Sequence, residues 1–496
     1  MKKNIYRIFV VLGLAILGCR TLLPNPAAVP VAVSPTTTIP APRRSVPTAT
    51  ATVAAPDGKP IHGTDSMNDP YYQQMGNGGY DALHYTIDLT VDVANDKING
   101  SATLDAQATE SLSSFNLDLH GLDVSAVTVN DMSAAFSRQK DELIIAPATS
   151  LANGEKFAVV VSYSGKPQPV EDASVPGDPV GWFADAGVYV VSESDGAMGW
   201  YPVNNHPLDK ATYTFRITAP KQYVVAANGL MKSEVVNGEM KTSVWEEIHP
   251  MSSYLSTLII GEYKLETESG PNGLPIHNYF PPDAGQEIKG GFSRTSEMIS
   301  YYSQVFGPYP FESYGVVVVP LELGFALEDQ TLSIFGKDLA SEIAAAHELS
   351  HQWFGDSVSL KSWKDIWLNE GFATYAESLW VEHKQGKTAG DKYMRDIYNQ
   401  AKAKNMPAPE DPSVGNLFAD SVYNRGGCVL YALRLKLGDD IFFKILHEYY
   451  ARYRDSNAST DDFIAVAETV SGQDLKAFFN DWLYSDKIPP LPKPGQ

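Results

Sequence analysis

A pair of histidines four residues apart constrains this chain more than any other feature of its sequence. The segment HELSHQWFGDSVSLKSWKDIWLNEGFATY covers residues 347–375, and Glu370 follows His351 after eighteen intervening residues. The surrounding apolar residues recur at helical spacing, so His347 and His351 project from one helix face, close enough to reach one cation. Two ordinary amphipathic helices with a few polar residues are the alternative. That alternative is weak, because random placement gives the five-residue pattern in roughly one chain in a hundred.

The residues beside the two histidines extend this prediction to a catalytic metal centre. Glu348 is offset from its neighbours by about 100° on a helix, so it can reach a water on the metal without occupying the metal itself. Catalytic zinc sites use three protein ligands and keep one position open, which makes Glu370 the natural third ligand. Two imidazoles and one carboxylate suit zinc better than calcium or magnesium. We therefore expect one Zn²⁺ per chain, bound by His347, His351 and Glu370.

Alternating polarity predicts a β domain in the first half of the chain. Apolar residues alternate with polar ones at Tyr85, Ile87, Leu89, Val91 and Val93, which is typical of a half-buried strand. A turn at residues 95–96 leads to a partner strand, and short strands punctuated by Gly, Asn and Pro continue to about residue 265. We expect an antiparallel, sandwich-like β domain over residues 69–266.

Helical patterns dominate after Gly270. We expect a helix over residues 285–306, a buried strand over 314–320, and long helices around His347, around Glu370 and from near Tyr423 onwards. The fold class is therefore expected to be multidomain α+β. In this prediction the β domain precedes a mainly helical domain over residues 267–496.

The first nineteen residues predict an export signal. Lys2, Lys3 and Arg7 precede an apolar run that is too short for a comfortable transmembrane helix. The run ends in ILGC, which resembles a bacterial lipobox, in which Cys19 becomes the acylated N-terminus. We expect an exported bacterial lipoprotein, anchored to a membrane and facing away from the cytoplasm, with ordinary secretion as the alternative.

A tether is expected between this signal and the folded domains. Residues 20–68 are rich in Pro, Thr and Ala, a composition that favours extended chain over a packed core. The only other cysteine is Cys428, so the mature chain can form no internal disulfide.

The net charge of the chain is −21, which argues against one class of partner. A strongly acidic surface repels phosphate backbones, so we expect no nucleic-acid binding. The same acidity is compatible with cationic ligands such as the free amino end of a peptide, although it more simply reflects solubility.

Several motifs resemble those of the gluzincin aminopeptidase family, which includes aminopeptidase N and leukotriene hydrolase. HELSHQWFG followed by WLNEGFATYAE resembles the family's zinc-ligand pattern. YPVNNHPLDKATYTF (201–215) resembles its β-domain signature, GFALEDQTL (324–332) its substrate-amine motif, and SVYNRGG (421–427) its Tyr-x-Lys-Gly motif. The likeness extends from about residue 80 to residue 487.

The resemblance implies a role for each matching residue. It implies a thermolysin-like catalytic domain in which His347, His351 and Glu370 bind zinc and Glu348 is the general base. Tyr423 would donate a hydrogen bond to the oxyanion of the tetrahedral intermediate. Two carboxylates would contact the free α-amino group of the substrate: Glu328, and, by a looser alignment, Glu193.

The chain also departs from the family pattern at several positions. Phe325 stands where the substrate-amine motif has its glycine, and Asp329 replaces its asparagine. Asn205 stands where many relatives have aspartate, and Arg425 replaces the lysine beside Tyr423. No counterpart of the family's large C-terminal helical domain follows, so the short form of the family with a more open cleft is expected.

These observations predict a zinc metallo-aminopeptidase that acts on peptides with a free N-terminus. An endopeptidase or an epoxide hydrolase on the same fold is one alternative, and a peptide-binding lipoprotein without turnover is another. The intact metal ligands, Glu348 and Tyr423 argue against the second alternative. The sequence leaves open the preferred N-terminal side chain, the physiological peptide, the oligomeric state and which membrane carries the anchor.

Overall fold

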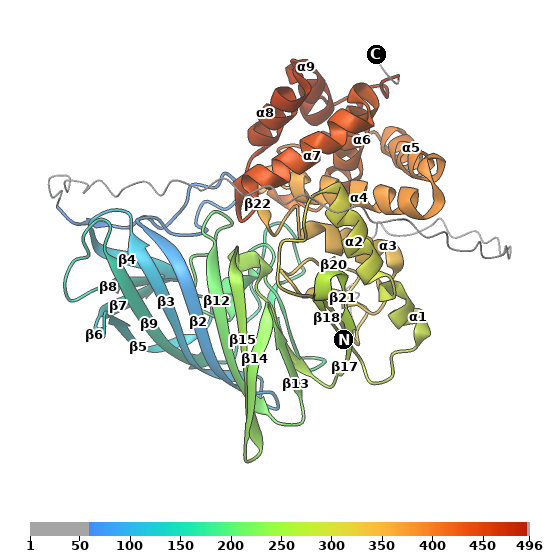
Figure 1. Ribbon diagram of the computed structural model, residues 1–496. Coiled ribbons are helices and arrows are strands. Elements are labelled where there is room, and N and C mark those ends of the chain that lie inside the picture. Colours follow the sequence, from blue (N-terminus) through green and yellow to red (C-terminus); the bar gives the residue numbers. More distant parts are fainter. Residues whose placement is uncertain (1–58, 494–496) are drawn as a thin grey trace, which may run out of the picture.

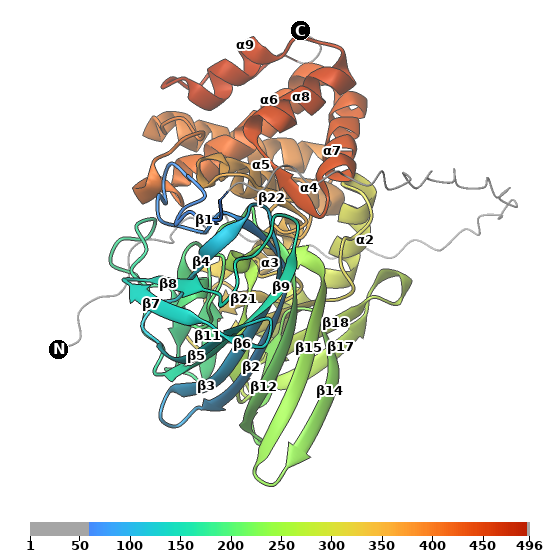
Figure 2. The same cartoon turned by 90° about the vertical axis from the view of Figure 1, so that its left-hand side faces the viewer.

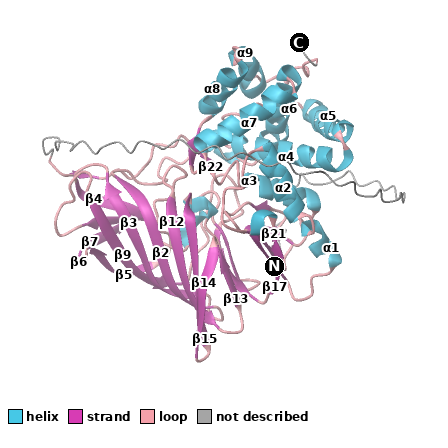
Figure 3. Ribbon diagram, viewed as in Figure 1, coloured by secondary structure: helices cyan, strands magenta, loops and turns pink. Residues whose placement is uncertain are grey.

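The computed structural model describes residues 59–493, which form a β domain and a helical domain packed against each other (Figures 1 and 3). The expected fold class, a β-rich domain before a mainly helical one, is confirmed. The expected signal peptide with Cys19, and residues 20–58 of the expected tether, lie outside the described residues. Within residues 59–493, no helix is both long enough and apolar enough to cross a membrane.

An eight-stranded sheet forms the main layer of the β domain (Figure 2). In spatial order its strands are β14 (Leu230–Asn237), β15 (Met240–Met251), β12 (Ala211–Pro220), β2 (Tyr80–Asp92), β3 (Lys97–Ala108), β9 (Lys156–Gly165), β5 (Asp123–Val129) and β6 (Met132–Ser133). Neighbours in this sheet are antiparallel except β2 and β12, which pair in parallel. The expectation of an antiparallel domain therefore misses this central pair.

The alternation read from the sequence places the core of this sheet. Tyr85, Ile87, Leu89 and Val91 of β2 are each at most 1% exposed, while the polar residues between them face outwards. The turn to β3 contains Asp96 in the left-handed region, with φ of 52°, a conformation that Asp tolerates better than most residues. Burial of one face of β2, β3, β9, β12 and β15 fixes the register of the sheet.

Two smaller sheets complete the β domain. The first contains β1 (Ile61–His62), β4 (Leu112–Asp118), β8 (Glu142–Ala146) and β7 (Ala135–Gln139). The second contains β10 (Gly181–Phe183), β11 (Val188–Val191), β16 (Leu258–Gly261) and β13 (Val224–Ala227). Because β1 already pairs with β4, the β domain begins before residue 69, where the sequence placed its start.

The helical domain has a five-stranded sheet of its own. In spatial order its strands are β17 (Lys264–Ser269), β18 (Pro275–Phe280), β19 (Tyr314–Val319), β21 (Ser333–Gly336) and the short edge strand β20 (Ala326–Leu327). The predicted domain boundary after residue 266 falls inside β17, because the exposed polar strand KLETES pairs with β18 rather than with the β domain. Strand β22 (Val358–Leu360) pairs with β23 (Ser456–Ala458) near the domain junction.

Nine α-helices are assigned within residues 59–493 (Figure 1). They are α1 (Gln286–Lys289), α2 (Thr295–Val305), α3 (Glu342–His351), α4 (Trp367–Gln385), α5 (Lys387–Lys404), α6 (Gly426–Leu437), α7 (Asp439–Tyr453), α8 (Thr460–Ser471) and α9 (Lys476–Phe479). The prediction of a single helix over 285–306 is wrong, because the helix is interrupted between α1 and α2. A Cβ at Gly291 would lie 2.8 Å from the Ala340 carbonyl oxygen, so this glycine lets the short turn Gly290–Phe292 between the two helices approach the backbone before α3.

The segment between β1 and β2, residues 63–79, crosses the junction of the two domains and is called the N-terminal strap below. Its Asp69 accepts hydrogen bonds from the Ser362 hydroxyl and the Trp363 backbone N–H of the helical domain, at 2.9 and 3.0 Å. Its Asn77 exchanges hydrogen bonds with the Asn204 side chain of the β domain. The strap is therefore fastened to both domains.

Candidate metal centre and active site

Two helices bring the three candidate metal ligands together. Ser341 caps the start of α3 by accepting a hydrogen bond from the Ala344 backbone N–H, and this helix presents His347 and His351 on one face. Glu370 lies in the first turn of α4, which packs against α3. Its Oε2 lies 3.2 Å from His347 Nε2 and 3.6 Å from His351 Nε2. All three side chains are buried.

The second nitrogen of each imidazole is also held. His347 Nδ1 lies 2.7 Å from Glu377 Oε1, and His351 Nδ1 lies 3.2 Å from the Phe354 carbonyl oxygen. A proton on each Nδ1 satisfies these acceptors and turns both Nε2 lone pairs towards Glu370. Such support of the second ring nitrogen is the usual arrangement around histidine metal ligands.

The electrostatics of this cluster favour a cation at its centre. Burial lowers the pKa of His351, but the charges of Glu328 and Glu370 outweigh it and raise that pKa to about 9. Burial raises the pKa of Glu370, but both histidines outweigh it and lower that pKa to about 2. One ligand atom from each of His347, His351 and Glu370 lies within 4.8 Å of the others. Two nitrogens and one carboxylate oxygen in this space fit a Zn²⁺ ion.

Glu348 and Tyr423 face the same centre. Burial and the neighbouring carboxylates Glu328 and Glu370, opposed in part by the two histidines, raise the pKa of Glu348 to about 8. Tyr423 lies in the π-helical turn Ser421–Arg425 before α6, with its ring centroid 6.0 Å from that of His347. Burial, followed by the charge of Glu370, raises the pKa of Tyr423 well above its usual value, so its hydroxyl remains a proton donor.

Two further carboxylates, Glu328 and Glu193, lie beside the metal ligands. Glu328 follows the edge strand β20, and its carbonyl oxygen accepts a hydrogen bond of 3.0 Å from the Gln352 side chain. Glu193 follows β11 of the other domain. One carboxylate oxygen from each of Glu193, Glu328 and Glu370 lies within 4.8 Å of the others. The structure thus brings all seven sequence-predicted site residues around one centre.

Both of these carboxylates carry an unsatisfied oxygen. Glu193 Oε1 and Glu328 Oε1 are buried without a hydrogen-bond partner. Burial, followed by repulsion from Glu328 and Glu370, raises the pKa of Glu193 well above its usual value. Burial likewise raises the pKa of Glu328. Unpaired buried acceptors are costly, so this corner of the site is built to receive a hydrogen-bond donor, and a cationic donor best of all.

The residues that depart from the family pattern differ in how deeply their side chains are buried. Asp329 is buried next to Glu328, and its Oδ2 has no hydrogen-bond partner. The Asn205 side-chain amide donates a hydrogen bond of 2.8 Å to Oδ1 of Asp195, which lies two residues after Glu193. The Arg425 guanidinium is buried and donates to the Met406 and Trp482 carbonyl oxygens, which ties the turn holding Tyr423 to the C-terminal segment. Phe325 is half-buried.

Sequence reasoning missed two supporting residues, Glu377 and Tyr393. Glu377 lies seven residues after Glu370, so both share one face of α4, and this spacing was the available signal. The Tyr393 hydroxyl of α5 donates to the other Glu377 oxygen, Oε2. Nothing in the sequence around Tyr393 marks this contact, because α5 meets α4 only in the folded domain.

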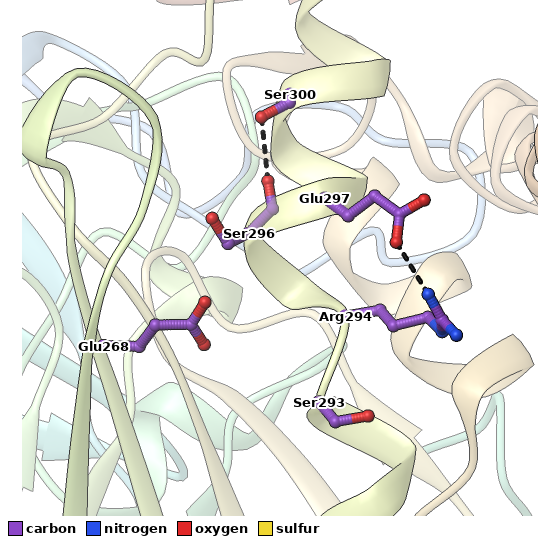
Figure 4. A pocket seen from close by; sticks show the side chains of 6 residues that line it. All are labelled: Glu268, Ser293, Arg294, Ser296, Glu297 and Ser300. Atoms are coloured by element: carbon purple, nitrogen blue, oxygen red, sulfur yellow. Dashed lines mark hydrogen bonds and ion pairs between the residues drawn. The ribbon is translucent and has the colours of Figure 1, made fainter. Parts of the chain in front are cut away.

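A surface hollow lies apart from these residues, between β17 and the start of α2 (Figure 4). Its lining is polar, and Arg294 in it is already paired with Glu297 at 2.9 Å. None of the seven candidate residues lines it. We therefore assign it no role in the chemistry of the site.

Family models match most of the described chain. Residues 81–255 match the model described as the peptidase M1 N-terminal domain, and residues 291–482 match the peptidase family M1 domain. The two matches correspond to the β domain and the helical domain, and the second contains all three candidate metal ligands.

Individual relatives agree with these matches. Aminopeptidase N of Streptomyces lividans is 31% identical over 310 residues, which are 55% of this chain and 35% of that protein. Aminopeptidase M1-B of Oryza sativa subsp. japonica is 27% identical over 321 residues, 60% of this chain and 37% of that protein. The chain thus spans little more than a third of the length of these curated relatives.

Among solved structures, an M1 zinc metallopeptidase from Deinococcus radiodurans resembles the whole described fold. Its TM-score is 0.81 at 32% identity, and the match covers 86% of this chain and 99% of that chain. A mutant of the Deinococcus radiodurans enzyme was solved with a Tyr-Ser-Ala substrate, at the same TM-score and identity.

Proposed function

This chain belongs to peptidase family M1, and on that basis we propose that it is a zinc-dependent aminopeptidase, which removes residues from the N-termini of peptides. His347, His351 and Glu370 would hold one zinc ion per chain. The fit of their donor atoms supports this assignment, as does the zinc named for the Deinococcus radiodurans relative.

The residues around the metal ligands have the chemistry that peptide hydrolysis needs. When bound, zinc lowers the pKa of a water molecule and polarises the scissile carbonyl group. Glu348 accepts the proton from the attacking water and passes it to the leaving amine. Tyr423 donates a hydrogen bond to the carbonyl oxygen as negative charge develops there, and one such donor contributes about 3 kcal/mol.

The single observation that carries the aminopeptidase assignment is the pair of unsatisfied oxygens on Glu193 and Glu328. A substrate ammonium group supplies the hydrogen-bond donors that these buried oxygens lack, together with a positive charge. Its capture fixes how far the scissile bond lies from the end of the chain. An endopeptidase has no use for such a pair beside its metal.

The experiment that tests this assignment compares free and N-acetylated versions of one peptide. Acetylation removes the charge that Glu193 and Glu328 would bind, so we expect the wild type to cleave the acetylated peptide at least about 30-fold more slowly, since removing one partner of a buried charge pair costs about 2–5 kcal/mol. In Glu328→Ala, the rate of cleavage of the free peptide should fall, and the ratio of the rates on the free and acetylated peptides should become smaller. The matched control is Glu322→Ala, which removes an exposed carboxylate on the other side of the short strand β20, paired with Lys337 at the surface.

Equal rates on free and acetylated peptides would move the protein into the endopeptidase class. A purified protein with zinc but without hydrolysis of any aminoacyl anilide would favour the non-catalytic alternative instead. The identity of the metal is checked separately by elemental analysis, which should give one zinc per chain.

We also propose that the protein acts outside the cytoplasm, held to a membrane through an acylated Cys19. The support is the sequence of the first nineteen residues alone. Cys19→Ser should move the protein from the membrane fraction to the soluble fraction or block its processing. Unchanged membrane association in that variant would contradict the anchor.

A further inference from the structure

The amine-binding corner of the site is divided between two domains. Glu193 belongs to the β domain, whereas Glu328 and the three metal ligands belong to the helical domain. The distance between the Glu193 carboxylate and the metal centre therefore depends on how firmly the two domains are joined beside Glu193. The N-terminal strap, residues 63–79, lies at this place and contacts both domains.

The strap grips the helical domain next to α4. Besides the two hydrogen bonds to Asp69, the Tyr72 ring packs against the Trp363 ring with centroids 5.9 Å apart. Trp363 in turn packs against Tyr254. The Tyr254 hydroxyl accepts a hydrogen bond from the side chain of Asn369, which is the residue before Glu370. The strap is thereby connected to the turn that supplies a metal ligand.

The strap also reaches the residue that follows Glu193. The Tyr72 hydroxyl lies 2.7 Å from Asp172 Oδ1 and 2.7 Å from Ser194 Oγ. Asp172 Oδ2 accepts hydrogen bonds from the backbone N–H groups of Ser194 and Asp195, at 3.2 and 3.1 Å. Tyr72, Asp172 and Ser194 are each at most 8% exposed. The backbone on the C-terminal side of Glu193 is thus held by a buried network that a strap residue completes.

We propose that Tyr72 is a positioning residue of the amine subsite, and that through Asp172 and Ser194 the strap holds Glu193 at its working distance from the metal centre. This inference rests on the proposed function, since it assigns Glu193 to the substrate ammonium group. Tyr72 does not touch the substrate. It fixes the backbone beside Glu193 to the same segment that is bonded to Ser362 and Trp363.

The decisive variant is Tyr72→Phe, which keeps the ring against Trp363 and removes only the hydroxyl. A buried hydrogen bond that holds the backbone beside Glu193 is lost, so the KM for a free-amine aminoacyl anilide should rise about five- to tenfold. The value of kcat should stay within about twofold, because ammonium binding is common to the ground state and the transition state. Zinc content should not change.

The neighbouring tyrosine provides a matched control. Tyr71 is half-buried, and its hydroxyl donates 2.6 Å to Asp411 Oδ1 and accepts from the Ser413 backbone N–H, away from Ser194. Tyr71→Phe removes the same group from the same strap and should leave KM at the wild-type value. A merely structural role for Tyr72 would reduce the fraction of active enzyme, and hence the apparent kcat, without moving KM.

A double-mutant cycle tests whether Tyr72 acts through Glu193. In a Glu193→Ala background, Tyr72→Phe should raise KM no further, because the carboxylate that it positions is already gone. Independent, multiplying effects of the two changes would overturn the inference. If Tyr72→Phe does not accumulate as folded protein, Ser194→Ala removes the hydroxyl on the other side of the same contact and should raise KM in the same way.

The outcomes separate this inference from the proposed function. If the wild type cleaves free and acetylated substrates equally, the aminopeptidase assignment fails first. In a second outcome the wild type prefers the free substrate, but Tyr72→Phe and Ser194→Ala show the same KM as Tyr71→Phe. The aminopeptidase assignment then stands, and the positioning role of the strap is wrong.

Discussion

Glu348 is the residue whose removal should separate metal binding from turnover. Its side chain is buried beside the two histidines but is not needed as a ligand once Glu370 completes the donor set. In Glu348→Gln the amide cannot accept a proton from the attacking water, so kcat/KM should fall by about 10²–10⁴-fold. Zinc content and the thermal midpoint should stay close to the wild-type values. Activity within tenfold of the wild type would place the general base elsewhere.

At the scale of single residues, the sequence points to the candidate metal ligands more directly than to the residues around them. His347 and His351 share one helical turn and Glu370 follows on the next helix, so local spacing alone points to them. Tyr423 and Glu193 lie far along the chain from this segment, and they become candidates only through motif resemblance. Tyr423 reaches the centre through the packing of the Ser421–Arg425 turn against α4, and Glu193 through the packing of the two domains, and no local periodicity encodes either contact.

The pairing of α4 with α5 yields a prediction about metal affinity. Glu377 on α4 holds His347 Nδ1 at 2.7 Å, and Tyr393 on α5 donates to the same carboxylate. Glu377→Ala leaves the imidazole free to rotate, and loss of such supporting partners typically weakens metal binding by about 10–100-fold. The measurement is zinc affinity by competition with a chelator, which does not depend on turnover.

Tyr393→Phe is a milder variant of the same contact and can be compared with Glu377→Ala. It leaves Glu377 in contact with His347 and removes only the second support, so zinc affinity should fall by less than in Glu377→Ala. Wild-type zinc affinity in Glu377→Ala would show that the α3 backbone and Phe354 alone fix the imidazoles, and that the α4–α5 contact has no part in metal binding.

The elements were predicted well where one face is buried and poorly where backbones approach closely. The alternation of β2 was sufficient to place its core residues. The break between α1 and α2 was not predictable from periodicity, and the turn that separates the two helices packs against Ala340 of a distant segment through Gly291. The parallel pairing of β2 with β12 was equally hidden, since residues more than a hundred positions apart set it.

Part of the joint between the two domains is polar, beside the aromatic contacts of Trp363 with Tyr72 and Tyr254, and this has consequences for the whole molecule. Half-buried Lys210 of the β domain donates hydrogen bonds to the Asp356 and Ser357 carbonyl oxygens of the helical domain, at 2.7 and 3.1 Å. Burial lowers the pKa of Lys210 to about 7. Polar junctions of this kind specify one relative placement of two domains, because a shifted joint would leave buried groups unpaired.

His249 of β15 makes part of this joint sensitive to pH. Its Nδ1 lies 3.7 Å from Asp455 Oδ1 and its Nε2 lies 3.6 Å from Glu312 Oε2, both in the helical domain. The Asp455 carboxylate raises the pKa of His249 above its usual value of 6.5. Burial acts in the opposite direction, and the charge of Glu312 adds to the increase. His249 in turn lowers the pKa of Asp455 below its usual value of 3.8.

The last prediction follows from the signs of these two shifts. The raised pKa of His249 means that its contribution is fully present below pH 6.5 and is lost as the pH rises through the raised pKa. The lowered pKa of Asp455 means that its contribution is present above pH 3.8 and is lost only at stronger acidity. His249→Gln should therefore lower the thermal midpoint by about 1–3 °C at pH 5.5 and by less at pH 8.5. His447→Gln is the control, because this imidazole bonds the Gln304 carbonyl oxygen within the helical domain. A His249→Gln deficit that is equal at the two pH values would mean that packing, not charge, is what this histidine contributes to the joint.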